Sequence, residues 1–206
     1  MRAVGADVRL AGHDFDAAKD AARAHAAASG ARFVEDGREP AIAEGAGTIA
    51  VELGAWPAPL DALLVPLGNG ALAAGVGTWV KAHAPRTRVV AVCAAAAPSM
   101  ARSLAEGRVV TTDRADTVAD GIAVRVPIPE ALDDLRPLLD DVLLVEEGHI
   151  LAAVRLLARH AGVVVEPAGA AGVAALLAHG ARFRDQRVAT ILCGANVTPE
   201  QLAAWL

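Results

Sequence analysis

Residues 61–75 read D-A-L-L-V-P-L-G-N-G-A-L-A-A-G, and this stretch decides the fold. The apolar run at 61–65 is typical of a strand that is buried on both faces, and the alanine-rich stretch from Leu72 onward predicts a helix. Pro66, Gly68 and Gly70 lie between the two. Two interpretations of this loop are open: a tight turn, which is the commoner meaning of a lone G-x-G, or a set of backbone N–H groups that hold a phosphate at the start of the helix.

The same alternation of short apolar runs and longer alanine-rich stretches continues along the chain. It predicts strands at 7–10, 31–34, 63–66, 89–93, 142–145 and 188–193. It predicts helices at 15–28, 45–53, 72–83, 98–106, 148–160, 168–179 and 199–205, with Asp14 and Thr198 as helix caps. Continuously apolar strands separated by helices indicate an α/β protein: a mostly parallel sheet in three layers, with helices on both faces.

A polar stretch, D-G-R-E-P at 36–40, follows the second predicted strand and marks a candidate domain boundary. We therefore expect residues 1–40 to be the remnant of a small domain and residues 41–206 to form the large domain. The first six residues, M-R-A-V-G-A, read as the last turn of a helix that runs into a strand. Two explanations are open: a frayed first turn, or a domain of which a piece is missing upstream.

Composition excludes several classes of protein. The net charge is -5 and no basic stripe occurs, so neither nucleic acid nor an anionic membrane is an expected partner. No apolar stretch reaches the roughly 20 residues that span a bilayer, and charges stand where a signal peptide needs its apolar region. Cys93 and Cys193 are far apart and read as reduced thiols, which favours the cytoplasm. No H-x-x-x-H, C-x-x-C or G-x-S-x-G motif is present.

Five motifs follow one another in a distinctive order. They are E-G-A-G-T-I-A-V-E-L (44–53), V-P-L-G-N-G-A-L-A-A-G (65–75), T-V-A-D-G-I-A-V-R (117–125), E-P-A-G-A-A-G-V-A-A-L (166–176) and C-G-A-N-V (193–197). In this order the chain resembles the fold-type II pyridoxal-phosphate enzymes, in particular the threonine/serine dehydratase and serine racemase family. The resemblance covers essentially the whole chain, and G-A-D-V-R-L-A-G-H-D-F-D-A-A (5–18) resembles the end of the family's small domain.

The resemblance implies a pyridoxal 5'-phosphate site. Its phosphate would lie on the backbone N–H groups of Gly68, Asn69, Gly70, Ala71 and Leu72, its ring pocket would include Gly121 and Glu166, and Cys193 would stand beside the pyridine nitrogen, with Asn196 shaping the following loop. A neutral thiol there leaves the ring a weaker electron sink, which suits β-elimination. Two features depart from the family: Asn69 and Ala71 replace two glycines of the phosphate loop, and Cys93 stands where serine racemase-like members carry a metal-binding glutamate. We expect no metal.

The family's Schiff-base lysine lies in an S/F-x-K-x-R-G segment, and its substrate loop reads S-x-G-N-H; neither is present. The chain has two lysines, Lys19 and Lys81. Lys81 lies about 15 Å along a helix from the phosphate loop, which is too far to reach the cofactor's aldehyde. The resemblance therefore implies a threonine/serine ammonia-lyase in a truncated, inactive form, with no catalytic residue of its own. The alternative is a non-catalytic phosphate-binding module.

Several properties stay open at this level. The resemblance implies a small amino acid as substrate, but without the substrate loop the sequence does not separate threonine from serine or a dehydratase from a racemase. The family commonly forms dimers or tetramers, so a homo-oligomer is one alternative for its assembly.

Overall fold

The computed structural model describes all residues from 1 to 206, and the chain divides into two compact units, residues 1–35 and 36–206. The first unit contains a short 3-10 helix, η1 (Arg2–Val4), and the helix α1 (Phe15–Ser29). Asp14 caps α1 as predicted, because its Oδ1 accepts a hydrogen bond from the Ala17 amide at 2.8 Å. That this unit is the remnant of a small domain stays a prediction.

The strands predicted at 7–10 and 31–34 are wrong. Both segments are irregular, mostly exposed backbone, and neither pairs with another strand. An alternation of apolar and polar residues favours extended backbone, but a strand also needs a neighbour for its N–H and C=O groups. No strand of the first unit supplies one.

The second unit begins with helix α2 and contains four strands, β1 to β4. In chain order its elements are α2 (Pro40–Gly54), β1 (Ala62–Pro66), α3 (Ala71–His83), β2 (Arg88–Ala94), α4 (Ser99–Glu106), η2 (Asp120–Ile122), α5 (Pro129–Leu135), β3 (Asp141–Val145), α6 (Glu147–Leu156) with a π-helical turn (Leu157–Ala161), η4 (Ala168–Ala170), α7 (Ala171–His179), η5 (Gly180–Phe183), β4 (Val188–Thr190) and α8 (Pro199–Trp205). The prediction missed α5, a seven-residue helix whose sequence signal is Pro129 at its first position. No helix of the chain is long and apolar enough to span a bilayer.

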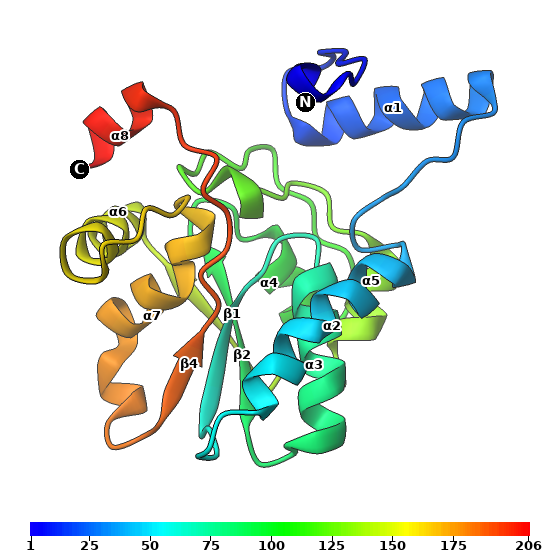
Figure 1. Ribbon diagram of the computed structural model, residues 1–206. Helices are drawn as coiled ribbons and strands as arrows, with labels where there is room; N and C mark the ends of the chain where they lie inside the picture. Colours follow the sequence, from blue (N-terminus) through cyan, green and yellow to red (C-terminus); the bar gives the residue numbers. More distant parts are fainter. The chain divides into compact units, whose positions relative to one another are not determined.

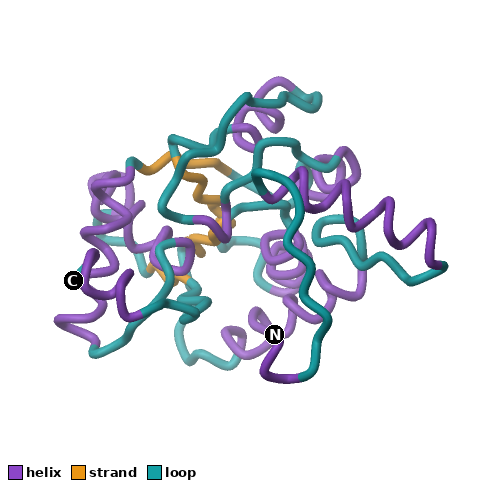
Figure 2. Tube along the Cα trace, turned by 90° about the horizontal axis from the view of Figure 1, so that it is seen from above, coloured by secondary structure: helices purple, strands orange, loops and turns teal.

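The four strands form one parallel sheet in the order β3-β2-β1-β4 (Figure 1). Within the second unit α6 and α7 cover one face and α2 to α5 the other, so the predicted three-layer α/β fold is confirmed (Figure 2). The chain adds β2 and β3 on one side of β1 and then returns to add β4 on the other side. The strand order therefore reverses between β1 and β4, where open α/β sheets bind their ligands.

The packing of strand β1 explains why its sequence is apolar at every position. Leu64 packs into the cluster beneath α6 and α7, whereas Leu63 and Val65 pack into the cluster beneath α2 to α5. All three side chains are at most 1% exposed. Because both faces of this central strand are covered by helices, neither set of alternate positions accepts a polar residue.

Strand β4 is shorter than predicted, ending at Thr190 rather than at Cys193. The Leu67 amide donates to the Val92 carbonyl on the β2 side, so the alternate residue Pro66 would have to donate toward β4. Proline has no N–H, and the β1–β4 ladder ends at the pair Leu64–Thr190. The chain beyond Thr190 is thereby free to form a loop at the carboxyl ends of the strands.

Lys81 anchors the far end of α3. Burial alone raises the pKa of Asp140, but hydrogen bonds from Lys81 Nζ (2.6 Å) and the Val89 amide (2.7 Å) outweigh it, and the pKa lies below its ordinary value. This carboxylate therefore contributes stability above its unfolded pKa of about 4, and the contribution is lost as the pH falls through the lower folded pKa.

We expect Lys81→Met to lower the free energy of unfolding by about 1 kcal/mol at pH 7, because the pair is only partly shielded from water. The difference from the unmutated protein should shrink to nothing once Asp140 is protonated at low pH. Urea unfolding at pH 7 and at about pH 2, chosen to lie below the lowered folded pKa, measures both values. Arg114→Met removes a fully exposed pair with Asp116 and serves as the control, with no measurable change. An equal loss from Lys81→Met at both pH values would contradict the role given to Asp140.

Candidate functional site

A small cavity of about 200 Å³ lies at the switch point, beyond the carboxyl ends of β1 and β4. Thirteen residues line it: Asp36, Pro66, Gly68, Asn69, Gly70, Ala71, Leu72, Gly121, Ile122, Glu166, Ala168, Cys193 and Gly194. All eight residues that the sequence predicted to bind the cofactor are in this set. Segments more than 120 residues apart in sequence thus meet around one space, as a ligand site at a switch point requires.

The start of α3 forms one wall of this cavity and leaves backbone N–H groups unpaired. Gly70 is the N-cap, with φ +111°, and no side chain caps the helix. The amide of Ala74 donates to the Gly70 carbonyl at 2.8 Å, so the amides before it have no acceptor within the helix. These amides and the positive end of the helix dipole favour an anion.

Small residues bring the cavity walls close to the loop. A Cβ on Gly68 would lie 3.1 Å from the Gly121 carbonyl oxygen and 3.3 Å from the Ile122 Cα, so these two segments touch through backbone. Gly37, with φ +84°, packs in the same way against the backbone carbonyl of Asn69. The residues present therefore fit a phosphate group: a backbone cradle, uncapped and lined by small side chains.

Glu166 ties the loop after β4 to the start of η4. Its Oε1 accepts from the Asn196 amide at 2.8 Å, and its own amide donates to the Gly194 carbonyl at 3.0 Å. Gly194 has φ +75°, and a Cβ there would lie 2.6 Å from the Glu166 carboxyl carbon. Sequence reasoning assigned Glu166 to the ring pocket only; its second role, holding the loop that carries Cys193, was missed.

The two cysteines have different surroundings. Burial raises the pKa of the Cys193 thiol, and the nearby Glu166 carboxylate raises it further. Cys93 is fully buried in β2, away from the cavity, and burial raises its pKa to about 12. Both are neutral thiols at pH 7, as the role predicted for Cys193 requires. The chain contains no group of three or more His, Cys, Asp or Glu side chains that could hold a metal, and the expectation of no metal stays a prediction.

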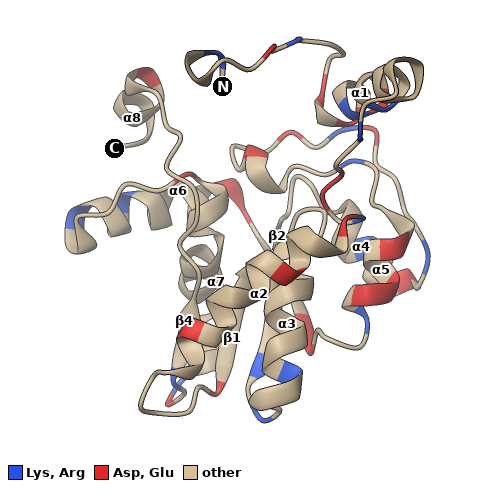
Figure 3. Ribbon diagram, turned by 45° about the vertical axis from the view of Figure 1, so that its right-hand side comes forward, with Lys and Arg blue, Asp and Glu red and all other residues tan.

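No lysine, arginine or histidine is among the residues that line the cavity. Lys81 lies in the last turn of α3, the end opposite to the cradle. Figure 3 shows basic positions (blue) at that end of α3. Lys19 belongs to the first unit, where its Nζ pairs with Asp16 at 3.0 Å and lies 5.8 Å from the centre of the Phe15 ring. The cavity therefore offers an anion neutral donors and a helix dipole; its charged lining residues are the carboxylates Asp36 and Glu166, and none is a cation.

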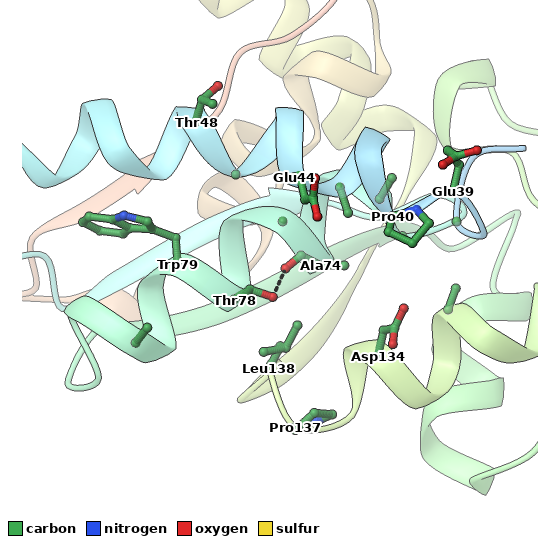
Figure 4. Close-up of a pocket in the computed structure, with 18 of the residues that line it drawn as sticks. Glu39, Pro40, Glu44, Thr48, Ala74, Thr78, Trp79, Asp134, Pro137 and Leu138 are labelled. Carbon is green, nitrogen blue, oxygen red and sulfur yellow. Dashed lines mark hydrogen bonds between the residues drawn. The ribbon is translucent and has the colours of Figure 1, made fainter. Parts of the chain in front are cut away.

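A second, larger groove of about 700 Å³ lies between α2, α3 and α5 (Figure 4). Its floor consists of small residues, among them Gly47, Ala74 and Gly75. Carboxylates line it as well: Glu39, Glu44, Asp133 and Asp134. Arg38 and His83 line the groove too, and the smaller cavity has two carboxylates of its own, Asp36 and Glu166, so charge does not separate the two. The smaller cavity is the better anion site because the whole loop 68–72 lines it, with the unpaired amides at the start of α3.

Known proteins resemble this chain in both sequence and structure. A family model described as pyridoxal-phosphate dependent enzyme matches residues 1–194. The L-threonine ammonia-lyase of Geobacter sulfurreducens is 37% identical over 196 residues, which are 95% of this chain and 49% of that protein. Among solved structures, threonine deaminase isoform 2 of Solanum lycopersicum matches with a TM-score of 0.90 at 31% identity, covering 98% of this chain and 56% of that one. Maize serine racemase matches with a TM-score of 0.88 at 25% identity, covering 98% and 63%.

These comparisons also measure how much of the relatives is represented. The chain spans about half the length of the curated relatives it matches. The family model's match, residues 1–194, contains the sheet, the cradle and the loop after β4 as far as Gly194, and it ends before α8.

Proposed function

The chain belongs to the family of pyridoxal-phosphate dependent enzymes, and from that premise we propose that it carries the phosphate- and ring-binding part of an ammonia-lyase acting on L-threonine or L-serine. One observation carries the proposal: the eight residues predicted to bind the cofactor surround a single cavity at the switch point of the sheet. When bound, pyridoxal phosphate would supply the electron sink for elimination of water across Cα–Cβ of such an amino acid; one water is then taken up again as the released imine is hydrolysed, so that the net products are a 2-oxo acid and ammonia.

The residues of this chain divide the binding work between two ends of the cavity. The unpaired amides at the start of α3 hold the phosphate, and Gly68 leaves room for the phosphate to approach them because it has no side chain. At the other end, Cys193 presents a neutral thiol toward the ring nitrogen and Glu166 fixes the loop that positions it. A neutral partner does not hold a ring nitrogen protonated, which suits the departure of a β-hydroxyl.

The lysine content favours a second candidate function, binding without turnover. None of the residues lining the cavity is a lysine, and Lys81 is held by Asp140 at the opposite end of α3. Without an amine beside the cofactor's aldehyde, the covalent step that makes the substrate Cα acidic has no nucleophile. We therefore propose that this polypeptide alone binds the cofactor but does not release ammonia from L-threonine.

We expect the purified chain to bind pyridoxal phosphate with a dissociation constant in the micromolar range and pyridoxal, which lacks the phosphate, about 100-fold more weakly, because the cradle supplies most of the contacts. Equilibrium dialysis measures both constants. Bound cofactor should also slow the alkylation of Cys193 by iodoacetamide. Cys93 is the internal control, since burial keeps it unreactive with or without the cofactor.

Two results would each refute one part of the proposal. Equal affinity for pyridoxal and pyridoxal phosphate would refute the cradle. Ammonia release from L-threonine, together with a borohydride-stable cofactor adduct on Lys19 or Lys81, would refute binding without turnover and assign the catalytic lysine. The proposal also includes the substrate, L-threonine or L-serine, and assembly into a homo-oligomer. Turnover would be compared between the two amino acids if the chain releases ammonia.

A further inference from the structure

Asn69 occupies the middle of the phosphate loop, between Gly68 and Gly70, and its presence there has no conformational explanation. Asparagine is favoured over other side chains where the backbone is left-handed. The only non-glycine residue of this chain with positive φ is Asp185, so the backbone at Asn69 is open to any L-residue. The reason for an asparagine must lie in its side chain.

That side chain is buried without a partner. Asn69 is 5% exposed, lines the cavity, and its Oδ1 accepts no hydrogen bond. Two other buried polar residues of this unit are paired: Ser99 donates to the Val124 carbonyl at 2.5 Å, and Thr87 to the Leu60 carbonyl at 2.7 Å. His149 Nδ1 is the other buried polar side-chain atom of this unit without a partner, and His149 does not line the cavity. A buried carboxamide that lacks a partner within the protein calls for one from outside it.

The charges around the cavity indicate the chemistry of that partner. The loop leads into the uncapped start of α3, which favours an anion, and no cationic side chain lines the cavity. Any phosphate held there depends on neutral N–H donors alone. A carboxamide carries two such donors, and its O and NH₂ ends exchange places by a half-turn about the last side-chain bond. A phosphate oxygen, which only accepts, fits the NH₂ end.

We infer that the Asn69 carboxamide donates a hydrogen bond to the phosphate group bound at the start of α3 and so adds a side-chain ligand to the backbone cradle. The inference rests on the proposed function, since it takes the ligand's phosphate to lie in this cavity. It goes further in naming a positioning residue that a glycine loop lacks. Asn69 would increase the affinity for the phosphate group and leave the contacts to the ring unchanged.

The first test compares three ligands across variants of the full chain. We expect Asn69→Ala to weaken both pyridoxal phosphate and inorganic phosphate about tenfold, the factor for one lost hydrogen bond to a charged group, with pyridoxal unchanged. Asn69→Asp keeps the shape but adds a negative charge, and should weaken the two phosphate ligands about 100-fold. Asn69→Ser, which retains a shorter donor, should lie between the unmutated chain and Asn69→Ala.

The control removes a side-chain amide at the other end of the unit. Gln186→Ala should leave all three affinities unchanged, since Gln186 pairs with Arg88 at the far end of the sheet. Affinities of Asn69→Ala within twofold of the unmutated chain would overturn the inference and leave the proposed function standing. An equal loss for pyridoxal would also overturn it, because that would indicate a structural role. Failure of the unmutated chain to bind either phosphate ligand would refute the proposed function as well.

A second measurement needs no variant that could misfold. The chain has two asparagines, Asn69 and Asn196, and two glutamines, Gln186 and Gln201, so a ¹⁵N-labelled sample shows four side-chain NH₂ groups. Addition of inorganic phosphate to saturation should move the Asn69 pair and leave the two glutamine pairs in place. An Asn69 pair that moves no more than the glutamine pairs would overturn the inference.

Discussion

Gly169→Ala is expected to lower the free energy of unfolding by about 3 kcal/mol, the upper end of the range for overpacking a close contact. A Cβ on Gly169 would lie 1.8 Å from the carbonyl oxygen of Cys193 and 3.0 Å from its amide nitrogen. Both atoms belong to the backbone of the loop after β4, so no flexible side chain can move aside. The loop or the η4 turn must shift, and Cys193 shifts with it.

The same substitution should weaken binding of pyridoxal phosphate by more than tenfold, since Cys193 and Glu166 line the cavity together. Thermal unfolding, with an expected drop of about 6–12 °C for a chain of this size, and equilibrium dialysis measure the two effects. Gly180→Ala is the matched control. It lies at the other end of α7 in a right-handed conformation with no atom near its Cβ, and should be neutral or slightly stabilising. Equal melting temperatures for Gly169→Ala and Gly180→Ala would show that the loop is not held against η4.

The sequence correctly predicted the central strand that is buried on both faces, and it wrongly predicted two strands that have no neighbour to pair with. The run at 62–65 is apolar at every position because helices cover both faces of β1, and that pattern predicts a central parallel strand. The segments at 7–10 and 31–34 mix apolar and polar residues and find no strand to pair with. Pairing is a property of the whole unit, and no local pattern contains it.

The candidate site shows the same division. The resemblance of the loop at 68–72 to a phosphate loop, with Asn69 and Ala71 as departures, implied an anion site, and the structure brings the loop together with Gly121, Glu166 and Cys193 in one cavity. The sequence offered no sign that Asn69 is buried without a partner, or that Glu166 bonds the Asn196 amide. Such facts depend on distances between segments that are far apart in sequence, 30 residues for Glu166 and Asn196, and a motif read along the chain does not contain them.

Gly75→Ala is expected to be about as destabilising as Gly169→Ala, through the packing of α2 on α3. A Cβ on Gly75 would lie 1.9 Å from the Ala43 carbonyl oxygen and 2.7 Å from the Gly47 amide nitrogen. The two helices are therefore in backbone contact at this crossing, and even one methyl group must push them apart. A loss of about 3 kcal/mol follows, because the sheet behind α3 and the buried side chains around it resist the movement.

Gly45→Ala, on the helix that Gly75 contacts, is the matched control for this crossing. No atom lies within 4 Å of its would-be Cβ, and alanine is the better helix former, so it should raise the free energy of unfolding by about 0.5–1 kcal/mol. Urea unfolding of the two variants should thus give changes of opposite sign from the same Gly→Ala substitution. Because α3 begins at the cradle, the displaced helix in Gly75→Ala should also weaken binding of inorganic phosphate, whereas Gly45→Ala leaves it unchanged. A stabilising effect of Gly75→Ala would mean that the helices do not meet at this glycine, and that the cradle is positioned by the sheet alone.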